Sequence, residues 1–230
     1  MSRLRIATYN LHSGIGLDRR FRPQRISDVI AELDADIIAI QELLSPVFGC
    51  DVHEHLRRET GFHLATMTTM QLAGGTFGNA VLSRWPIQDH VEHDLTIGAQ
   101  EPRGALDVII GRGRSKLRVM ATHLGLRTEE RRLQISRLVE IARAEPDVPT
   151  VLAGDLNVRR ARGRELIACL EYFGNVAAPN TFPSITPILP LDRIFASPSA
   201  LLLSVEAHRS RRARIASDHL PLVATIELQD

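Results

Sequence analysis

The chain has 230 residues, of which 44% are hydrophobic and 24% are charged, and this composition predicts one globular domain over residues 1–230 rather than a disordered chain. Its 28 Lys and Arg residues nearly balance its 27 Asp and Glu residues, and the formal net charge of +1 excludes the overall basic field of a sequence-independent nucleic-acid binder. Two cysteines, Cys50 and Cys169, lie far apart without any metal-ligand spacing, which excludes a disulfide framework and a zinc knuckle.

The N-terminal residues lack the apolar run that a signal peptide needs, and no later segment approaches the ~20 apolar residues of a membrane span. We therefore expect a cytoplasmic protein with no transmembrane segment. The sequence contains no internal repeat and no low-complexity tract, and no change of composition marks a linker.

Short strands and amphipathic helices follow one another along the chain. Apolar patterns that alternate or are rich in β-branched residues predict strands over residues 4–9, 37–40, 63–68, 79–83, 105–110, 117–122, 150–153, 191–196, 202–207 and 222–228. Helical spacing of apolar residues predicts one helix that begins near Pro23 and another that begins at Thr128 and ends before Pro146. Weaker patterns predict helices over residues 51–60 and 164–172 and a hairpin turn over residues 111–115. These elements favour an α/β (α+β) fold in which two packed sheets lie between two helical layers.

Polar side chains follow the apolar strands at the points where these strands end or begin. They are Asn10 and His12, Gln41 and Glu42, Asn79, Thr122 and His123, Asp155 and Asn157, and Ser217 with Asp218 and His219. If these strand ends meet at one edge of the packed sheets, they bring carboxylates, amides and imidazoles into one cleft. Such a set predicts a site for a hard metal ion with a base beside it.

The ligand types favour Mg²⁺, with Mn²⁺ as the alternative, over zinc. Hard divalent cations take oxygen ligands, usually one or two carboxylates that water and substrate phosphate complete. Glu42 with Asp218, helped by Asn10, meets this demand, whereas zinc prefers nitrogen or sulfur ligands.

The segment Gly154-Asp155-Leu156-Asn157 places an acid and an amide on the same side of an extended chain, because side chains in a strand repeat every two residues. The acid can take a proton or position water while the amide holds a phosphoryl oxygen. His219 needs a partner that fixes its tautomer, and Asp192 is the candidate.

Seven short motifs occur in a fixed order between residues 8 and 221. They are Thr8-Tyr9-Asn10, Gln41-Glu42, Gly78-Asn79-Ala80, Thr122-His123-Leu124, Gly154-Asp155-Leu156-Asn157, Leu191-Asp192-Arg193-Ile194 and Ser217-Asp218-His219-Leu220-Pro221. This order resembles the signature of the endonuclease/exonuclease/phosphatase superfamily, which includes pancreatic deoxyribonuclease, abasic-site endonucleases, neutral sphingomyelinases and inositol polyphosphate phosphatases. The resemblance implies a four-layer α/β/β/α sandwich with the cleft at one edge and two packed mixed sheets.

For the metal, the resemblance implies that Glu42 is the principal Mg²⁺ ligand and that Asn10 and Asp218 lie beside the ion. The chain departs from the abasic-site endonucleases at His12, where those enzymes carry an acid two residues after the first Asn. This departure weakens the match to their metal arrangement and points to a separate phosphate-binding role for His12.

For the reaction, the resemblance implies in-line attack of water on phosphorus, with a carboxylate or His219 as the base. Asp155 and Asn157 then handle the nucleophile and the phosphate, and Asp192 orients the catalytic His219. His123 donates a hydrogen bond to a phosphate oxygen, and Asn10 contributes to catalysis as well as to the metal site.

Arginine runs over residues 159–164 and 208–214 lie next to two of the motifs. They can hold an anionic substrate. A solvated surface is the favoured interpretation of either run taken alone, whereas two runs that both adjoin motifs bring the two interpretations close to even. The predicted substrate-binding residues are His12, Asn79, Arg103, Arg211 and Arg212.

Together these features predict a metal-dependent phosphoester hydrolase whose favoured substrate is nucleic acid, cut as a phosphodiester. A phospholipid phosphodiesterase or small-metabolite phosphatase of the same fold is the first alternative, and a catalytically silent binding module is the second. Only 4% of the residues are aromatic, which disfavours damage-specific repair by base stacking. No feature of the sequence indicates an obligate protein partner.

Overall fold

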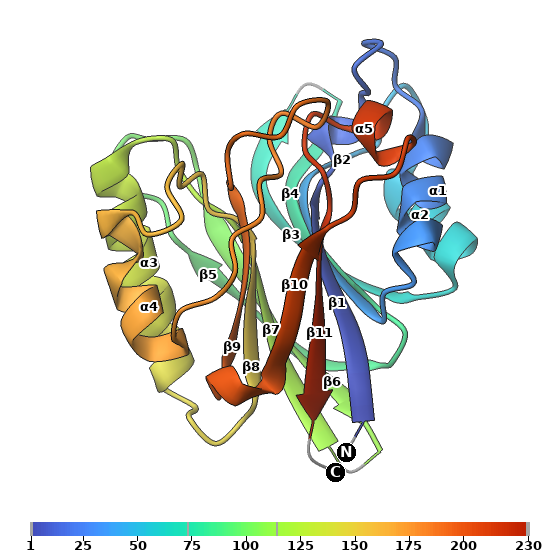
Figure 1. Ribbon diagram of the computed structural model, residues 1–230. Coiled ribbons are helices and arrows are strands. Elements are labelled where there is room, and N and C mark those ends of the chain that lie inside the picture. The colour runs from blue at the N-terminus through green and yellow to red at the C-terminus, as the bar shows by residue number, and fades with distance from the viewer. Residues whose placement is uncertain (1, 73, 114, 229–230) are drawn as a thin grey trace.

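The predicted strands assemble into two mixed β-sheets that pack face to face, and helices cover the outer face of each sheet (Figure 1). The structure is a computed structural model, which describes residues 2–72, 74–113 and 115–228. Its α/β/β/α layers confirm the predicted fold class.

The first sheet has six strands within the described residues, in the order β10-β11-β1-β2-β4-β3. Strands β1 and β2 run parallel, and the other neighbours in this sheet run antiparallel. The strands are β1 Ser2–Asn10, β2 Ile37–Ser45, β3 His63–Leu72, β4 Gly75–Ser83, β10 Leu202–Ala207 and β11 Leu222–Leu228.

The second sheet has five strands within the same described ranges, in the order β5-β6-β7-β8-β9. Strands β7 and β8 are its parallel pair. The strands are β5 Ile87–Asp94, β6 Gly104–Arg112, β7 Ser115–His123, β8 Thr150–Asp155 and β9 Asp192–Ser197. Strands β6 and β7 pair antiparallel up to Arg112 and Ser115, which confirms the predicted hairpin, although Arg114 in its turn lies outside the described residues.

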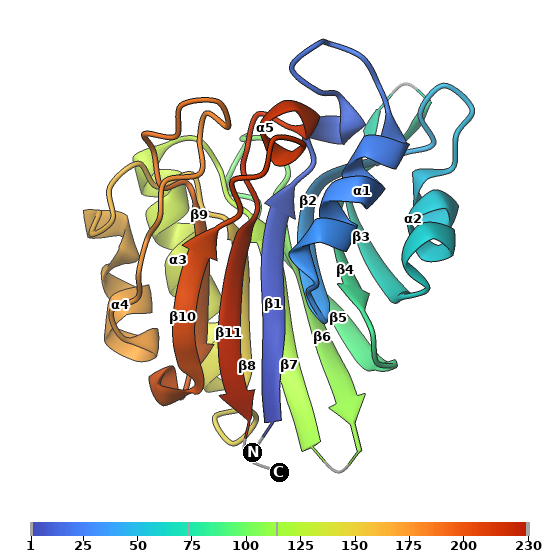
Figure 2. The same ribbon diagram turned by 45° about the vertical axis from the view of Figure 1, so that its right-hand side comes forward.

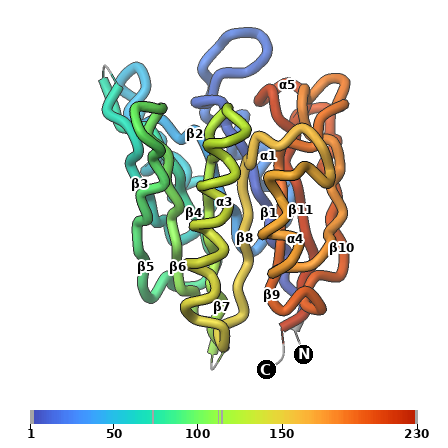
Figure 3. The backbone as a smooth tube through the Cα atoms, turned by 90° about the vertical axis from the view of Figure 1, so that its left-hand side faces the viewer, coloured from blue at the N-terminus to red at the C-terminus, as the bar shows by residue number. Residues whose placement is uncertain are grey.

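Helices α1 and α2, with the single turn α5, cover the first sheet, and helices α3 and α4 cover the second (Figures 2 and 3). The helices are α1 Pro23–Leu33, α2 Val52–Thr60, α3 Thr128–Arg143, α4 Ile167–Phe173 and α5 Ala213–Ala216, and short 3₁₀ turns are η1 His12–Gly14, η2 Arg164–Leu166 and η3 Ser199–Leu201. None of the helices in the described ranges is long and apolar enough to cross a membrane.

Burial of both faces explains why the central strands are apolar along almost their whole length. In β2, Ile37 and Ala39 pack between the two sheets, whereas Ile38 and Ile40 pack under the helices. A strand covered on one face alone would alternate apolar with polar residues, so a continuous apolar run is typical of a strand that lies between two layers.

Two elements have no counterpart in the sequence prediction. Strand β5 is an edge strand with a largely exposed, polar sequence that carries no apolar alternation. Helix α5 is a single turn that begins at the end of the arginine run over residues 208–214, and it is too short to show a helical period. Contacts with neighbouring elements stabilise both: β5 pairs with β6, and Ala213 and Ala216 of α5 pack in the core beneath α1. Neither has a hydrophobic pattern of its own that predicts it.

The two parallel pairs determine where the functional residues meet. Strands β1 and β2 run in one direction and end at the same edge, and so do β7 and β8. In Figure 1 this edge lies at the upper end of the sandwich, opposite the end at which β1 begins and β11 finishes. The polar residues that follow these strands are thereby brought together.

Replacement of Gly154 tests the close approach of β7 and β8 at this edge. A Cβ at this position would collide with the backbone carbonyl oxygen of Thr122 on the neighbouring strand. We expect Gly154→Ala to lower the free energy of unfolding by about 1 to 3 kcal/mol because the two backbones must separate. Urea denaturation measures this change, and Ser204→Ala on the exposed edge of β10 serves as the control. Equal stability of Gly154→Ala and wild type would contradict the close packing of the strands.

Candidate active site

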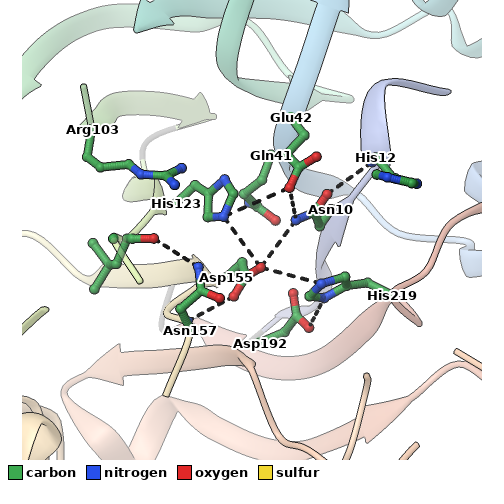
Figure 4. Close-up of polar contacts among 12 residues, drawn as sticks. Asn10, His12, Gln41, Glu42, Arg103, His123, Asp155, Asn157, Asp192 and His219 are labelled. Carbon is green, nitrogen blue, oxygen red and sulfur yellow. Dashed lines mark hydrogen bonds and ion pairs between the residues drawn. The ribbon is translucent and has the colours of Figure 1, made fainter. Parts of the chain in front are cut away.

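The ends of both sheets supply side chains to one cluster, and Figure 4 shows how they face one another. Each comes from the end of a strand or from the loop beside it. They are Asn10 at the end of β1, Glu42 in β2, His123 at the end of β7, Asp155 at the end of β8, Asp192 at the start of β9 and His219 before β11.

A bulge in β2 directs Glu42 into the cluster. The pairing of β2 with β4 shifts between Ile40 and Leu43, so that β2 holds one residue more than its partner. Glu42 itself has a positive φ of 55°, a backbone conformation that non-glycine residues rarely adopt and that often occurs at functional sites. The bulge and the strained backbone at Glu42 together point its carboxylate into the cluster.

Asn10 links two of the carboxylates. Its Nδ2 donates to Glu42 Oε1 at 2.9 Å and to Asp155 Oδ2 at 3.2 Å. Its Oδ1 accepts a hydrogen bond from the backbone N–H of His12 at 3.0 Å. The buried amide thus fixes the relative positions of the two acids.

Asp155 lies between two imidazoles. Its Oδ2 is 3.6 Å from His123 Nε2 and 3.6 Å from His219 Nε2. Its Oδ1 accepts a hydrogen bond from the backbone N–H of Asn157 at 2.9 Å, while Asn157 Nδ2 donates to the carbonyl oxygen of Leu124 at 2.9 Å. Asn157 has a positive φ of 54°, so the turn after β8 is strained in the same way as Glu42.

His219 is held by Asp192, as predicted from the sequence. The distance from its Nδ1 to Asp192 Oδ2 is 2.9 Å, and the hydroxyl of Thr181 donates to the same oxygen. Burial disfavours the imidazolium, but the charge and hydrogen bond of Asp192, together with the charges of Asp155 and Asp218, outweigh it and raise the pKa of His219 to about 10. At neutral pH this side chain is therefore a buried cation.

His123 has the opposite electrostatics. Burial, with smaller contributions from Arg103 and His219, lowers its pKa to about 4 against the attraction of Asp155. It is therefore a neutral imidazole at neutral pH. Arg103 points toward it in Figure 4, and the Arg103 side chain is 6% exposed and pairs with Glu101 at 3.0 Å.

The carboxylates around Asn10 fit a hard divalent cation. Burial is the main cause of a raised pKa at Glu42; the charges of Asp218 and Asp155 raise it further, while the hydrogen bond from Asn10 lowers it. A cation beside Glu42 would relieve this repulsion, and oxygen is the donor that Mg²⁺ and Mn²⁺ prefer.

A second group with ligand geometry lies close by. Ligand atoms of Asp155, Asp192 and His219 lie within 4.8 Å of one another. Because Asp192 faces His219 through a hydrogen bond of 2.9 Å, these two side chains form an orienting pair rather than open ligands.

The cluster opens into a cavity of about 730 Å³. Six of the residues predicted for the site line this cavity: Glu42, Arg103, His123, Asp155, Asn157 and His219. Asn10 and Asp192 are 1% and 0% exposed and support the lining residues from behind.

The structure places the other predicted residues outside the cavity lining. His12 lies beside Asp218, with His12 Nδ1 at 3.9 Å from Asp218 Oδ1. Asn79 is buried and donates to the carbonyl oxygen of Gly104. Arg211 and Arg212 line a separate hollow against α1, where Arg212 pairs with Glu32 at 2.8 Å.

Several residues that position the site were not predicted as such. Thr181 bonds Asp192 from a distant loop and carries no sequence signal. Ser217, within the last motif, donates to the carbonyl oxygen of Asn10 at 2.7 Å and so holds the His219 loop against β1. Arg131 and Arg159 line the cavity, and the position of Arg159 two residues after Asn157 was the available signal for it.

Comparisons with known proteins agree with this geometry. The model of the Endonuclease/Exonuclease/phosphatase family matches residues 7–219. The uncharacterized protein YbhP of Escherichia coli K12 is 29% identical over an alignment of 250 residues, which covers 97% of this chain and 96% of YbhP.

Two solved structures share the fold. The endonuclease/exonuclease/phosphatase from Bacteroides vulgatus has a TM-score of 0.81 at 20% identity, with 100% of both chains covered. The mannosyl-6-phosphatase from Bacteroides thetaiotaomicron has a TM-score of 0.78 at 18% identity, with 97% of this chain and 100% of that chain covered. Since the family model spans nearly the whole sequence, the chain belongs to the Endonuclease/Exonuclease/phosphatase family, whose members are generally divalent-metal-dependent phosphoester hydrolases.

Proposed function

We propose that residues 1–230 act as one catalytic domain that hydrolyses phosphodiesters by in-line attack of water, with nucleic acid as the substrate class. The observation that carries this proposal is the position of Asp155 Oδ2, which lies 3.6 Å from each of two imidazole Nε2 atoms and accepts a hydrogen bond from Asn10. A carboxylate with two imidazoles around it can hold and deprotonate water while the imidazoles face the phosphate oxygens.

The metal belongs at the Glu42 side of the cluster. Glu42 would hold Mg²⁺ or Mn²⁺, with Asp218 and Asn10 beside it. When bound, the ion neutralises charge that develops on the phosphoryl oxygens. The hydrogen bond from Asn10 to Glu42 keeps the carboxylate in place for this role.

Among the remaining residues of the cluster, some transfer the proton and others stabilise charge on the phosphate. Asp155 takes the proton of the attacking water, and the cationic imidazole of His219 faces the charge that develops on the phosphate. Asp192 holds this imidazole in a single orientation. Neutral His123 donates a hydrogen bond from Nε2 to a phosphate oxygen. The backbone N–H of Asn157 donates to Asp155 Oδ1 and holds this carboxylate in place.

The charge of the cavity supports a diester of nucleic acid as the substrate. Arg103, Arg131 and Arg159 line it together with the two histidines, alongside the acids Glu42, Glu101 and Asp155. Guanidinium groups bind phosphate through paired hydrogen bonds, so this wall suits a chain of phosphodiesters.

Removal of the histidine or the central acid should abolish turnover. We expect His219→Ala and Asp155→Asn each to lower kcat on bis-p-nitrophenyl phosphate by roughly a hundred- to ten-thousandfold, because Asp155→Asn removes the base and His219→Ala removes the cation that stabilises the developing charge. The assay is run with Mg²⁺ or Mn²⁺ and in parallel on plasmid DNA, single-stranded oligonucleotides, RNA and a phospholipid dispersion.

His90→Ala is the matched control, since His90 is exposed on β5 outside the cluster. Near-native turnover by His219→Ala would remove His219 from the proposed chemistry. Cleavage of the phospholipid alone would replace nucleic acid as the substrate, and silence of the metal-loaded wild type on every substrate would contradict the proposed reaction.

Replacement of Glu42 should weaken metal binding. We expect Glu42→Gln to raise the Kd for Mn²⁺ by about ten- to a hundredfold because a charged oxygen ligand is lost. Titration of free Mn²⁺ by electron paramagnetic resonance measures the change. Glu129→Gln, on the exposed side of α3, is the control. An unchanged Kd in Glu42→Gln would place the ion elsewhere.

A further inference from the structure

A second cavity of about 590 Å³ adjoins the active-site cavity. Thr128, Arg131 and Arg159 line both cavities, so the two are separated by shared side chains rather than by a layer of core. The start of α3 and the loop that follows β8 both lie at the edge where the sheets end, as Figure 3 shows. We name this second cavity the arginine pocket; Arg160, Arg162, Gly163, Arg164 and Glu165 complete its lining.

The charge of the arginine pocket is strongly positive. Five arginines line it, whereas Glu165 is the one acid in the lining. Glu165 is already engaged, because its Oε1 lies 3.2 Å from Arg131 Nη2. Among the described residues of the lining, no further carboxylate offsets the other four arginines.

Arg131 is a buried side chain in the wall of the arginine pocket, and hydrogen bonds hold it in place. Its side chain is 7% exposed, and its two terminal nitrogens donate to Leu126 O, Gly125 O, Thr128 Oγ1 and Glu165 Oε1. Its Nε, by contrast, is buried without a hydrogen-bond partner among the described residues. Arg131 is therefore a fixed, buried charge in the wall of the pocket, whereas the exposed arginines of its lining are the ones that an anion can reach.

The loop that carries the other arginines is anchored rather than free. The guanidinium of Arg193, which is 1% exposed, donates to the carbonyl oxygens of Asp192, Val158 and Arg160. One buried cation therefore ties the active-site acid Asp192 to the backbone that presents Arg159 and Arg160.

We propose that the arginine pocket binds a second phosphate group of the substrate while the first is cleaved beside Asp155. This inference rests on the proposed phosphodiester hydrolysis and specifies its substrate class: the preferred compound carries a second phosphate next to the scissile one. Arg159 lies on the boundary between the two cavities and can contact both groups, while Arg131 contributes its charge. The pocket is thus a determinant of specificity, since a substrate with a single phosphate leaves the arginines unpaired.

A pair of substrates isolates the contribution of the second phosphate. They are thymidine 5′-(p-nitrophenyl phosphate) and the same compound with a 3′-phosphate, assayed at constant ionic strength. For wild type we expect kcat/KM to be about tenfold or more higher for the compound with two phosphates, as charge-assisted contacts of this kind supply.

Two matched variants test the location. Arg162→Gln/Arg164→Gln removes two charges from the pocket, and Arg132→Gln/Arg137→Gln removes two from the exposed face of α3 nearby. We expect the ratio of the two kcat/KM values to fall at least fivefold in the pocket variant, mainly through KM, and to stay within twofold of wild type in the α3 variant. A ratio near one in wild type, or equal ratios in all three proteins, would overturn the inference.

Calorimetric binding of inorganic phosphate in EDTA separates this inference from the proposed function. Weaker phosphate binding in the pocket variant than in the α3 variant supports phosphate binding by the arginine pocket, even if neither nucleotide is cleaved. In that case the proposed hydrolysis of diesters is the claim that is wrong. Equal phosphate binding in the two variants counts against the pocket. Two competitors identify the source of the second phosphate. If an octathymidylate inhibits turnover and a sugar bisphosphate does not, the source is a polynucleotide. If only the sugar bisphosphate inhibits, the source is a small bisphosphate.

Discussion

Negative charge buried at one edge of the two sheets is the constraint on which the rest of the site depends. Asp155 and Asp192 have side chains that are 2% and 0% exposed, and that of Glu42 is 23% exposed. Ionised carboxylates in such surroundings need compensation. His219 compensates Asp192, and Arg193 adds a second buried cation behind it. Glu42 instead receives its hydrogen bond from the neutral amide of Asn10 and lies 4.0 Å from the neutral imidazole of His123, and we propose that a bound cation compensates its charge.

The layered fold makes this concentration of charge stable. The acids occupy strand ends, while the apolar lengths of the same strands lie between two covered faces and provide the core. Positive φ values occur at Glu42 and Asn157, which present the site, and also at loop and helix-end residues such as Ser13, Arg19 and Asp34. The arginines of the loop after β8 extend the same edge and line the arginine pocket beside the active-site cavity.

Much of the fold was predictable because burial on two faces leaves a strong pattern in sequences such as Ile37 to Ile40. Strand β5 escaped prediction since an exposed edge strand forms by pairing with β6, not by its own hydrophobicity. The order of motifs predicted which residues gather, and the Asp192–His219 contact follows that prediction. The sequence could not show which way the arginine side chains point. The run at residues 208–214 precedes the His219 loop, yet its Arg212 pairs with Glu32 on α1. The run after Asn157, by contrast, lines a cavity beside the site.

The most direct test of the account is the position of a divalent ion in crystals grown with Mn²⁺, located by anomalous diffraction. If Glu42 holds the metal, we expect a peak within bonding distance of a Glu42 carboxylate oxygen, on the side of Asn10 and Asp218, with the hydrogen bond between His219 and Asp192 intact. A peak between Asp155, Asp192 and His219, or no peak at Glu42 at saturating Mn²⁺, would contradict the claim that Glu42 is the acid compensated by metal.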